Sequence, residues 1–194
     1  MTKFIIHHIN QFSIVHAATF FSNGVEYEIT FQKLSSDNLI DSTLIFPDNF
    51  IFSNKGCWEV TFDIAENARK GTHYHPPVLG RVNAIQVFRI VENIIIDHYK
   101  QFQGGMYMYL PVNDEVAAIY RRLASKRLGK GITLEIGLEP YRRGNVLRTP
   151  QSYTGTSCRN AGSNRQTWSK DASYPRGAYL RENGSGNPRT SAGM

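Results

Sequence analysis

The spacing of the apolar residues changes from strand-like to helical at Asn83, and this change constrains the fold more than any other feature of the sequence. Before Asn83, apolar side chains alternate with polar ones over residues 25–32 and again over residues 58–64. This alternation is typical of strands with one buried and one exposed face. Residues 43–52 read as two short apolar pieces around a Pro-Asp-Asn turn. We therefore predict an antiparallel meander over residues 25–64.

From Asn83 the spacing is helical. Asn83 and Gln86 are placed as in a capping box, in which side chains bond the free N–H groups of the first helical turn. The polar residues that follow form a single stripe, and apolar residues fill the rest of the helix surface. The sequence thus predicts a long helix that lies on a sheet and ends at Gly104-Gly105.

The remaining elements complete a two-layer arrangement. Residues 106–112 are apolar on both faces, as in a central strand, and Asn113 can cap a second, shorter helix that opens with Asp114 and Glu115. Residues 132–136 alternate as one more strand. Strands first and helices later favour an α+β fold, an antiparallel sheet packed by two helices, over a doubly wound α/β fold. The first 22 residues stay open: residues 4–9 suit an edge strand and residues 14–21 a short helix.

The basic charge is concentrated at the C-terminal end of the sequence. Of the 194 residues, those up to Pro140 are close to electrically neutral, while residues 141–194 hold nine Lys and Arg against Asp171 and Glu182 only, within a total net charge of +6. Large aliphatic residues are almost absent after Leu147. Such a segment cannot bury enough apolar surface to offset its chain entropy. We expect a globular domain over residues 1–140 and a basic Gly/Ser/Arg-rich tail over 141–194, poorly ordered unless another surface orders it.

Several classes of protein are excluded by composition. No apolar run approaches the roughly 18 residues that a membrane helix needs, so no membrane partner is expected. The N-terminus has no pattern of a signal peptide. The two cysteines, Cys57 and Cys158, are too few for a disulfide scaffold. They are also too few for a structural zinc site unless histidines supply the other ligands. We therefore expect a chain that is not secreted.

Four segments together resemble a known group of proteins. They are GVEYEITF at residues 24–31, WEVTF at 58–62, NAIQVFRIVENII at 83–95 and IYRRL at 119–123. The chain resembles, over residues 24–128, a group of small bacteriophage-encoded proteins of unknown function, although Arg121 stands where the group has an acid and Ile90 where it has a small residue. The resemblance implies an α+β domain and a phage setting, in the host cytoplasm or the virion. It implies no activity and supplies no catalytic residues.

No catalytic residue is identified, no cofactor is expected, and we expect a protein that is not an enzyme. His73 and His75 are two apart on an extended segment and are the best candidate metal ligands. A third ligand would have to come from Asp63, Glu66 or His98. An exposed loop before Pro76-Pro77 explains the same two histidines equally well.

A basic cluster runs from the second helix into the tail, where single aromatic residues are interspersed. Arginines contact phosphates and aromatic rings stack on unpaired bases, so this pattern suits binding to single-stranded nucleic acid. The basic residues near the end of the second helix have an alternative explanation, because positive side chains there complement the helix dipole and form a solvated face. The candidate binding residues are Arg121, Arg122, Lys126, Arg127, Arg142, Arg143, Arg148, Arg159, Arg165, Trp168, Arg176 and Arg181.

These observations predict a non-enzymatic phage accessory protein whose basic arm binds single-stranded nucleic acid or an acidic protein partner. Two alternatives remain open: a structural component of the virion whose tail orders against neighbouring subunits, and a small hydrolase or nuclease, since two-layer α+β domains support many chemistries. The sequence does not indicate an oligomeric state.

Overall fold

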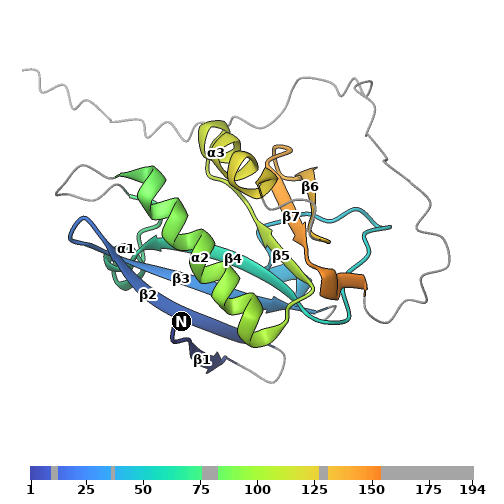
Figure 1. Cartoon of the computed structure of the whole chain (residues 1–194), viewed down its shortest axis with the longest axis horizontal. Coiled ribbons are helices and arrows are strands. Elements are labelled where there is room, and N and C mark those ends of the chain that lie inside the picture. Colours follow the sequence, from blue (N-terminus) through green and yellow to red (C-terminus); the bar gives the residue numbers. More distant parts are fainter. Residues whose placement is uncertain (10–12, 36–37, 76–82, 127–130, 154–194) are drawn as a thin grey trace, which may run out of the picture. The chain divides into compact units, whose positions relative to one another are not determined.

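The computed structural model describes residues 1–9, 13–35, 38–75, 83–126 and 131–153, which belong to one compact unit spanning Met1–Cys158. Seven strands form one mostly antiparallel sheet in the order β1-β2-β3-β4-β5-β7-β6, and two longer helices pack on it (Figure 1). The fold is therefore α+β, as the sequence predicts. No helix among these residues is both long and apolar enough to cross a membrane.

The N-terminal half of the sheet is built from local pairings. β1 (Ile5–His8) is the edge strand and pairs with β2 (Ile14–Ser22), which forms a hairpin with β3 (Val25–Leu34). The hairpin turns at Asn23 and Gly24, whose φ angles of 51° and 79° are those that an Asn-Gly turn favours. The edge strand over residues 4–9 is confirmed, but the helix suggested for residues 14–21 is wrong. Residues 16, 18, 20 and 22 are all buried, so the segment has the two-residue period of a strand.

The meander expected over residues 25–64 is also partly wrong. β3 pairs directly with β4 (Cys57–Ile64) in an antiparallel ladder from Tyr27–Ile64 to Leu34–Cys57. Residues 42–56 lie outside the named strands, and after the short helix η1 (Leu39–Asp41) they pack against one face of the sheet. Phe46, Phe50 and Phe52 contact one another there at centroid distances of 4.8–5.0 Å. The apolar pieces that suggested strands belong to this aromatic cover.

The long helix α2 (Ala84–Phe102) forms as predicted. Its first turn is capped by the Asn83 side chain, whose Oδ1 accepts a hydrogen bond from the Gln86 backbone N–H at 3.2 Å. The helix ends at Gln103, which adopts a left-handed φ of 52°. Gly105 is required for a different reason, because a Cβ there would lie 1.9 Å from Ser53 Oγ.

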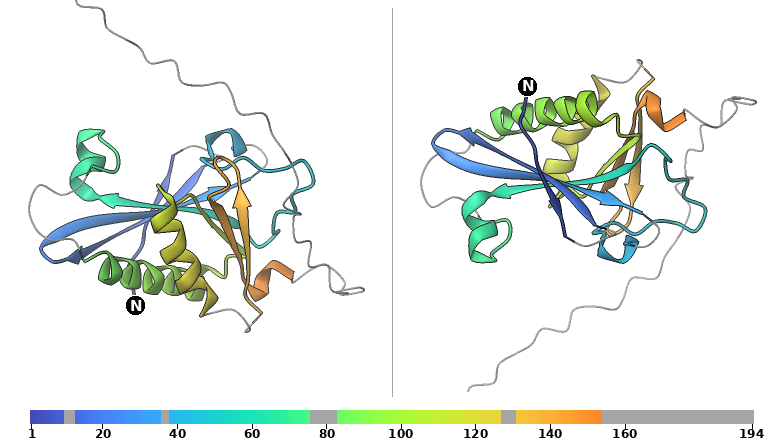
Figure 2. Two further views of the ribbon diagram at one scale, coloured as in Figure 1. Left: turned by 90° about the horizontal axis from the view of Figure 1, so that it is seen from above. Right: turned by 90° about the horizontal axis from the view of Figure 1, so that it is seen from below.

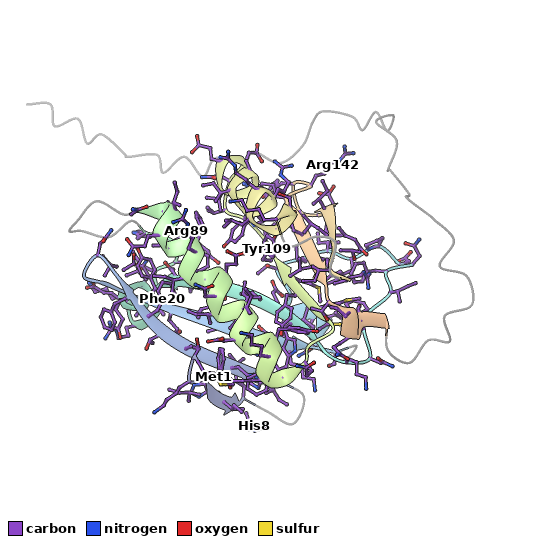
Figure 3. All side chains as sticks on the ribbon, viewed as in Figure 1. Met1, His8, Phe20, Arg89, Tyr109 and Arg142 are labelled. Atoms are coloured by element: carbon purple, nitrogen blue, oxygen red, sulfur yellow. The ribbon has the colours of Figure 1, made fainter. Side chains whose placement is uncertain are left out.

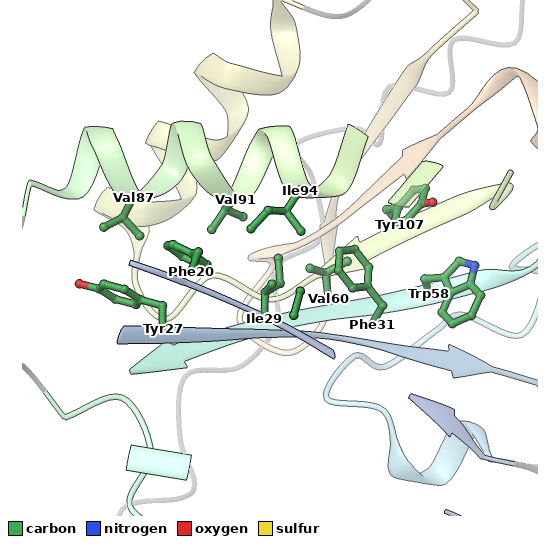
Figure 4. Packing of buried hydrophobic residues seen from close by; sticks show 11 residues of the cluster. Phe20, Tyr27, Ile29, Phe31, Trp58, Val60, Val87, Val91, Ile94 and Tyr107 are labelled. Carbon is green, nitrogen blue, oxygen red and sulfur yellow. The ribbon is translucent and has the colours of Figure 1, made fainter. Parts of the chain in front are cut away.

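One face of α2 packs on the sheet and completes the main core. Val87, Val91 and Ile94 point from the helix onto Ile29, Val60 and other residues of the sheet (Figure 4). A short helix α1 (Ala65–Lys70) follows β4 directly. Figure 2 shows α2 and α3 on one side of the sheet and α1 and η1 on the other.

The C-terminal half of the sheet begins with β5 (Met106–Tyr109), which is fully buried and runs parallel to β4 after the crossover through α2. The second predicted helix is α3 (Asp114–Ser125), and Asn113 caps it by accepting a bond from the Val116 N–H at 2.9 Å. β6 (Thr133–Leu138) is the other edge strand.

The boundary expected after Pro140 lies too early. β7 (Gly144–Arg148) is inserted between β5 and β6, and the chain then continues through a short helix η2 (Pro150–Tyr153). Val146 is fully buried in this strand. The strand is short and contains only two large aliphatic residues, so the composition of the segment concealed it. The rest of the expected tail, residues 154–194, lies outside the described residues.

Candidate functional site

A cleft opens where β4 and β5 separate. The two strands pair only from Cys57–Met106 to Glu59–Met108. Beyond Glu59, β4 continues beside β3 alone, while β5 ends at Tyr109 and the chain turns into α3. In Figure 1 the two strands diverge, β4 toward α1 and β5 toward α3. The splitting of a parallel strand pair therefore creates the cavity.

The cleft has a volume of about 480 Å³ and walls of aromatic, aliphatic and polar side chains. The Tyr109 and Tyr120 rings contact each other at a centroid distance of 4.6 Å with their planes tilted by 39°, and Tyr120 meets the Phe88 ring edge-on at 5.1 Å. Tyr109 is labelled between α2 and α3 in Figure 3. The volume lies within the range of small-molecule sites, and flat rings provide surfaces for a planar ligand. The other lining side chains used below are Thr43, Thr61, Asp63, Tyr74, His75 and Arg143.

The tyrosines of the cleft stay protonated at neutral pH. Burial raises the pKa of Tyr109 and of Tyr120. Burial, and then the negative charges of Asp63 and Glu59, raise the pKa of Tyr74. Each therefore offers a neutral hydroxyl group, which can donate or accept a hydrogen bond.

The rim of the cleft carries backbone strain. Tyr74, which lines the cleft, has a φ of 59°, and Tyr141 and Arg142, just before the lining residue Arg143, have φ values of 62° and 55°. Bulky residues rarely adopt such angles, which cost on the order of 1–3 kcal/mol each. The Tyr74 conformation is held by its N–H, which donates to Asp63 Oδ2 at 2.7 Å. Strained residues of this kind cluster at functional sites.

Among the polar side-chain atoms that are buried without a partner in the described residues, one is on the lining residue Arg143 and one is on Glu59, which does not line the cleft. One is Oε2 of Glu59, whose side chain is 3% exposed, and the other is Nε of Arg143. The Arg143 Nη1 donates to the Val112 carbonyl oxygen, and the guanidinium lies 4.8 Å from the centre of the Tyr141 ring. The Glu59 Oε1 accepts bonds from the N–H and the hydroxyl of Thr43. Glu59 and Arg143 thus leave one acceptor and one donor unused.

The predicted basic residues occupy different positions. Arg121, Arg122 and Lys126 are exposed on α3, and none forms an ion pair with another described residue. Arg142 lies at the outside of the molecule (Figure 3), 3.9 Å from Glu139 in an exposed pair. The predicted residues outside the described part of the chain are Arg127, Arg159, Arg165, Trp168, Arg176 and Arg181.

Arg148 is not available for binding. It is 9% exposed on β7, and its guanidinium pairs with Glu135 and donates to the Ile51 carbonyl oxygen at 2.9 Å. The side chain also lies over the Phe50 ring. Arg148 therefore attaches the aromatic cover to the sheet, and we remove it from the candidate interface.

The predicted metal ligands do not form a metal site with the third ligands considered for them. Asp63 lies close to the two histidines, but its carboxylate is hydrogen-bonded to the Tyr74 N–H and to Asn67, and His98 is buried in the core. In the part of the chain that the structure describes, no group of three or more His, Cys, Asp or Glu side chains could hold a metal ion. His73 and His75 are exposed, and His75 lines the cleft.

Sequence reasoning missed a buried chain of polar side chains in the core. His16 Nδ1 lies 2.9 Å from His98 Nε2, and His98 Nδ1 lies 2.9 Å from the Tyr107 hydroxyl. A signal was present in the helix, because His98 follows Val87, Val91 and Ile94 at core-facing spacing. Burial lowers the pKa of His98 to about 3 and, together with the charges of Lys33 and His8, also lowers that of His16.

Comparison with known proteins adds no relative. No protein-family model matches the chain, and neither a curated protein nor a solved structure matches it significantly. The function is therefore argued from the cleft and the charged surface alone.

Proposed function

We propose that this chain is a non-enzymatic protein that binds single-stranded nucleic acid through the exposed face of α3 and the basic arm that follows the sheet. The observation that carries the proposal is the row of cations on α3. Arg121, Arg122 and Lys126 face solvent, and no described carboxylate neutralises them. Unpaired arginines and lysines are the groups that contact phosphates.

The end of the described chain lies close to the start of β6. Pro150 lies beside Gly131, because a Cβ on Gly131 would come within 3.1 Å of the proline ring. η2 is the last described element before the arm. The sequence of the arm adds further arginines, which supply positive charge, and single aromatic residues, which can stack on bases.

The experiment is a salt titration of binding. Fluorescence anisotropy with a labelled single-stranded oligonucleotide should show that log affinity falls linearly with log salt, by about 0.7 for each contacted phosphate. Replacing Arg121, Arg122 and Lys126 with alanine should reduce that slope, and so should removal of residues 154–194. Lys55→Ala, which removes an exposed lysine before β4, is the matched control and should leave the slope unchanged.

Absence of salt-sensitive binding at micromolar protein would reject the nucleic-acid proposal. An acidic protein would then be the better partner for the same charges. The resemblance to phage-encoded proteins leads us to propose an accessory role during infection. Mass spectrometry of purified particles tests that role, because a virion subunit would be found in the particles.

A further inference from the structure

A second, smaller cavity lies next to the cleft. It has a volume of about 120 Å³, and most of its walls come from α2, α3 and the sheet. Four residues line both cavities, and these are Val60, Phe88, Tyr109 and Tyr120. The cleft and the smaller cavity therefore adjoin along a shared wall, in which the Phe88 and Tyr120 rings meet edge-on.

The smaller cavity is apolar. Apart from Glu92, all its lining residues are aliphatic or aromatic, and those that it does not share with the cleft are Val91, Ile95, Ile96, Leu123, Ala124, Ile132 and Leu147. Apolar cavities in proteins stay free of water and take up apolar molecules. The Glu92 carboxylate disfavours an anionic group at this end, because like charges repel. This cavity is therefore suited to the apolar part of a ligand.

The cleft carries an unpaired positive charge at Arg143. A guanidinium has five N–H donors, and one of them is used here, by the Val112 carbonyl oxygen. No carboxylate of the described residues forms an ion pair with Arg143. The other charged residue of the lining is Asp63, whose oxygens already accept hydrogen bonds from three N–H groups of neighbouring residues. A ligand that complements the cleft therefore carries a negative charge.

We propose that the two cavities together bind a fatty acid, with its carboxylate at Arg143 and its alkyl chain running along the shared wall into the smaller cavity. A carboxylate can accept two parallel hydrogen bonds from a guanidinium, and a flexible chain suits aliphatic walls. The site goes beyond the proposed function and is separate from the charged surface, because neither cavity is lined by Arg121, Arg122 or Lys126.

The test is a series of fatty acids of increasing length. The full-length protein, labelled with nitrogen-15, is titrated with butanoate, hexanoate and octanoate and followed by NMR. Each added methylene that enters the apolar space should raise the affinity about fourfold. The amide signal of Val116, which lines only the cleft, should shift with all three acids. The signal of Leu123, which lines only the smaller cavity, should shift with the longer chains.

Two pairs of variants locate the two ends of the ligand. Arg143→Gln should weaken octanoate binding roughly tenfold and leave 1-octanol binding unchanged, because the alcohol has no charge. Arg89→Gln, on an exposed residue of α2 outside both cavities, should retain the octanoate affinity. Ala124→Leu fills part of the smaller cavity and should end the gain in affinity before octanoate. Ala118→Leu, the same change on an exposed residue of α3, should retain the whole series.

Several results would overturn the proposal. Affinity that does not rise from butanoate to octanoate excludes the apolar path, and so does a rise that leaves the Leu123 signal in place. Shifts spread over exposed residues without saturation would show non-specific adsorption in place of a site. Equal loss of octanoate and 1-octanol binding in Arg143→Gln would remove the carboxylate from Arg143. Because the series uses the unmodified protein, its result does not depend on whether the variants fold.

Discussion

His16 Nδ1 and His98 Nε2 lie 2.9 Å apart in the core, on strand β2 and helix α2. One of these nitrogens must carry the proton and the other must accept it, so the contact requires that at least one ring is neutral. His98 is fully buried, stacks on Phe31 at 4.1 Å and also bonds the Tyr107 hydroxyl. The contact therefore joins the hairpin, the long helix and the central strand β5, and burial opposes a charge on His98 within it.

This pair predicts acid instability. The pKa of His98 is about 3 in the folded protein and 6.5 in the unfolded chain. Between these two pH values the unfolded chain therefore binds a proton that the folded protein does not. Stability is complete above about pH 6.5 and is lost as the pH falls toward the folded value. The free energy of unfolding should decrease by about 3 kcal/mol between pH 6.5 and pH 4. Urea denaturation at a series of pH values measures this loss.

The variant His98→Gln should be less stable at neutral pH and should depend less on pH in that interval. His7→Gln, on the exposed edge strand β1, is the control and should retain the acid sensitivity of the unmodified protein. A pH profile that is the same in His98→Gln and in the unmodified protein would show that other groups cause the acid instability.

Phe88 connects the core to the cleft, and replacing it with alanine should leave a large cavity that lowers the free energy of unfolding. Its ring is buried on α2 and contacts Phe62 at 5.9 Å and Tyr120 at 5.1 Å. Phe88→Ala should cost about 3–5 kcal/mol of unfolding free energy. Ile85→Ala, on the same helix but 61% exposed, should change it by less than about 0.5 kcal/mol. Similar losses in the two variants would mean that this helix face is wrongly assigned.

Removal of residues 154–194 should leave the body folded. The strands and helices described here end at Tyr153, and the last buried residues are Arg148 and Thr149. Thermal melts of the full-length and shortened proteins should have the same midpoint. A midpoint lower by more than about 4 °C, or on the order of 1 kcal/mol, would show that the arm contributes to the core.

Arg148 and Arg122 should respond in opposite ways to the same substitution. Arg148→Ala removes a partly buried ion pair and a bond to the Ile51 carbonyl oxygen, and should cost about 2 kcal/mol. The salt dependence of nucleic-acid binding should be the same in Arg148→Ala as in the unmodified protein. Arg122→Ala should leave stability within about 0.5 kcal/mol and lower the salt slope. If Arg148→Ala also lowered the slope of log affinity against log salt, Arg148 would have to contact the nucleic acid.

The elements that could be predicted are those whose signals are local. The caps at Asn83 and Asn113 depend on hydrogen bonds three residues away, and both helices begin where these residues predict. The turn at Asn23 and the alternating strands β3 and β4 depend on equally short-range chemistry.

The elements that were missed depend on distant partners. β7 has five residues, and its place between β5 and β6 is set by ladders to both neighbours. The aromatic residues 46–52 form a cover because Cys57, Met106 and Met108 lie beneath them on the sheet. The cleft depends on where β4 and β5 separate, and the register of two strands joined through a long helix is not encoded in either strand alone.

The position of β7 also sets the order of events during synthesis. In the described sheet, β6 pairs with β7, and β7 joins β6 to β5. The C-terminal half of the sheet therefore cannot close until residue 148 has been translated. The N-terminal hairpin and β4 have no such delay, since they pair in sequence order. Residues 154–194 are added after every strand is complete, which takes about 2–8 s at 5–20 residues per second. The strands of the described sheet are therefore all synthesised before the basic arm is.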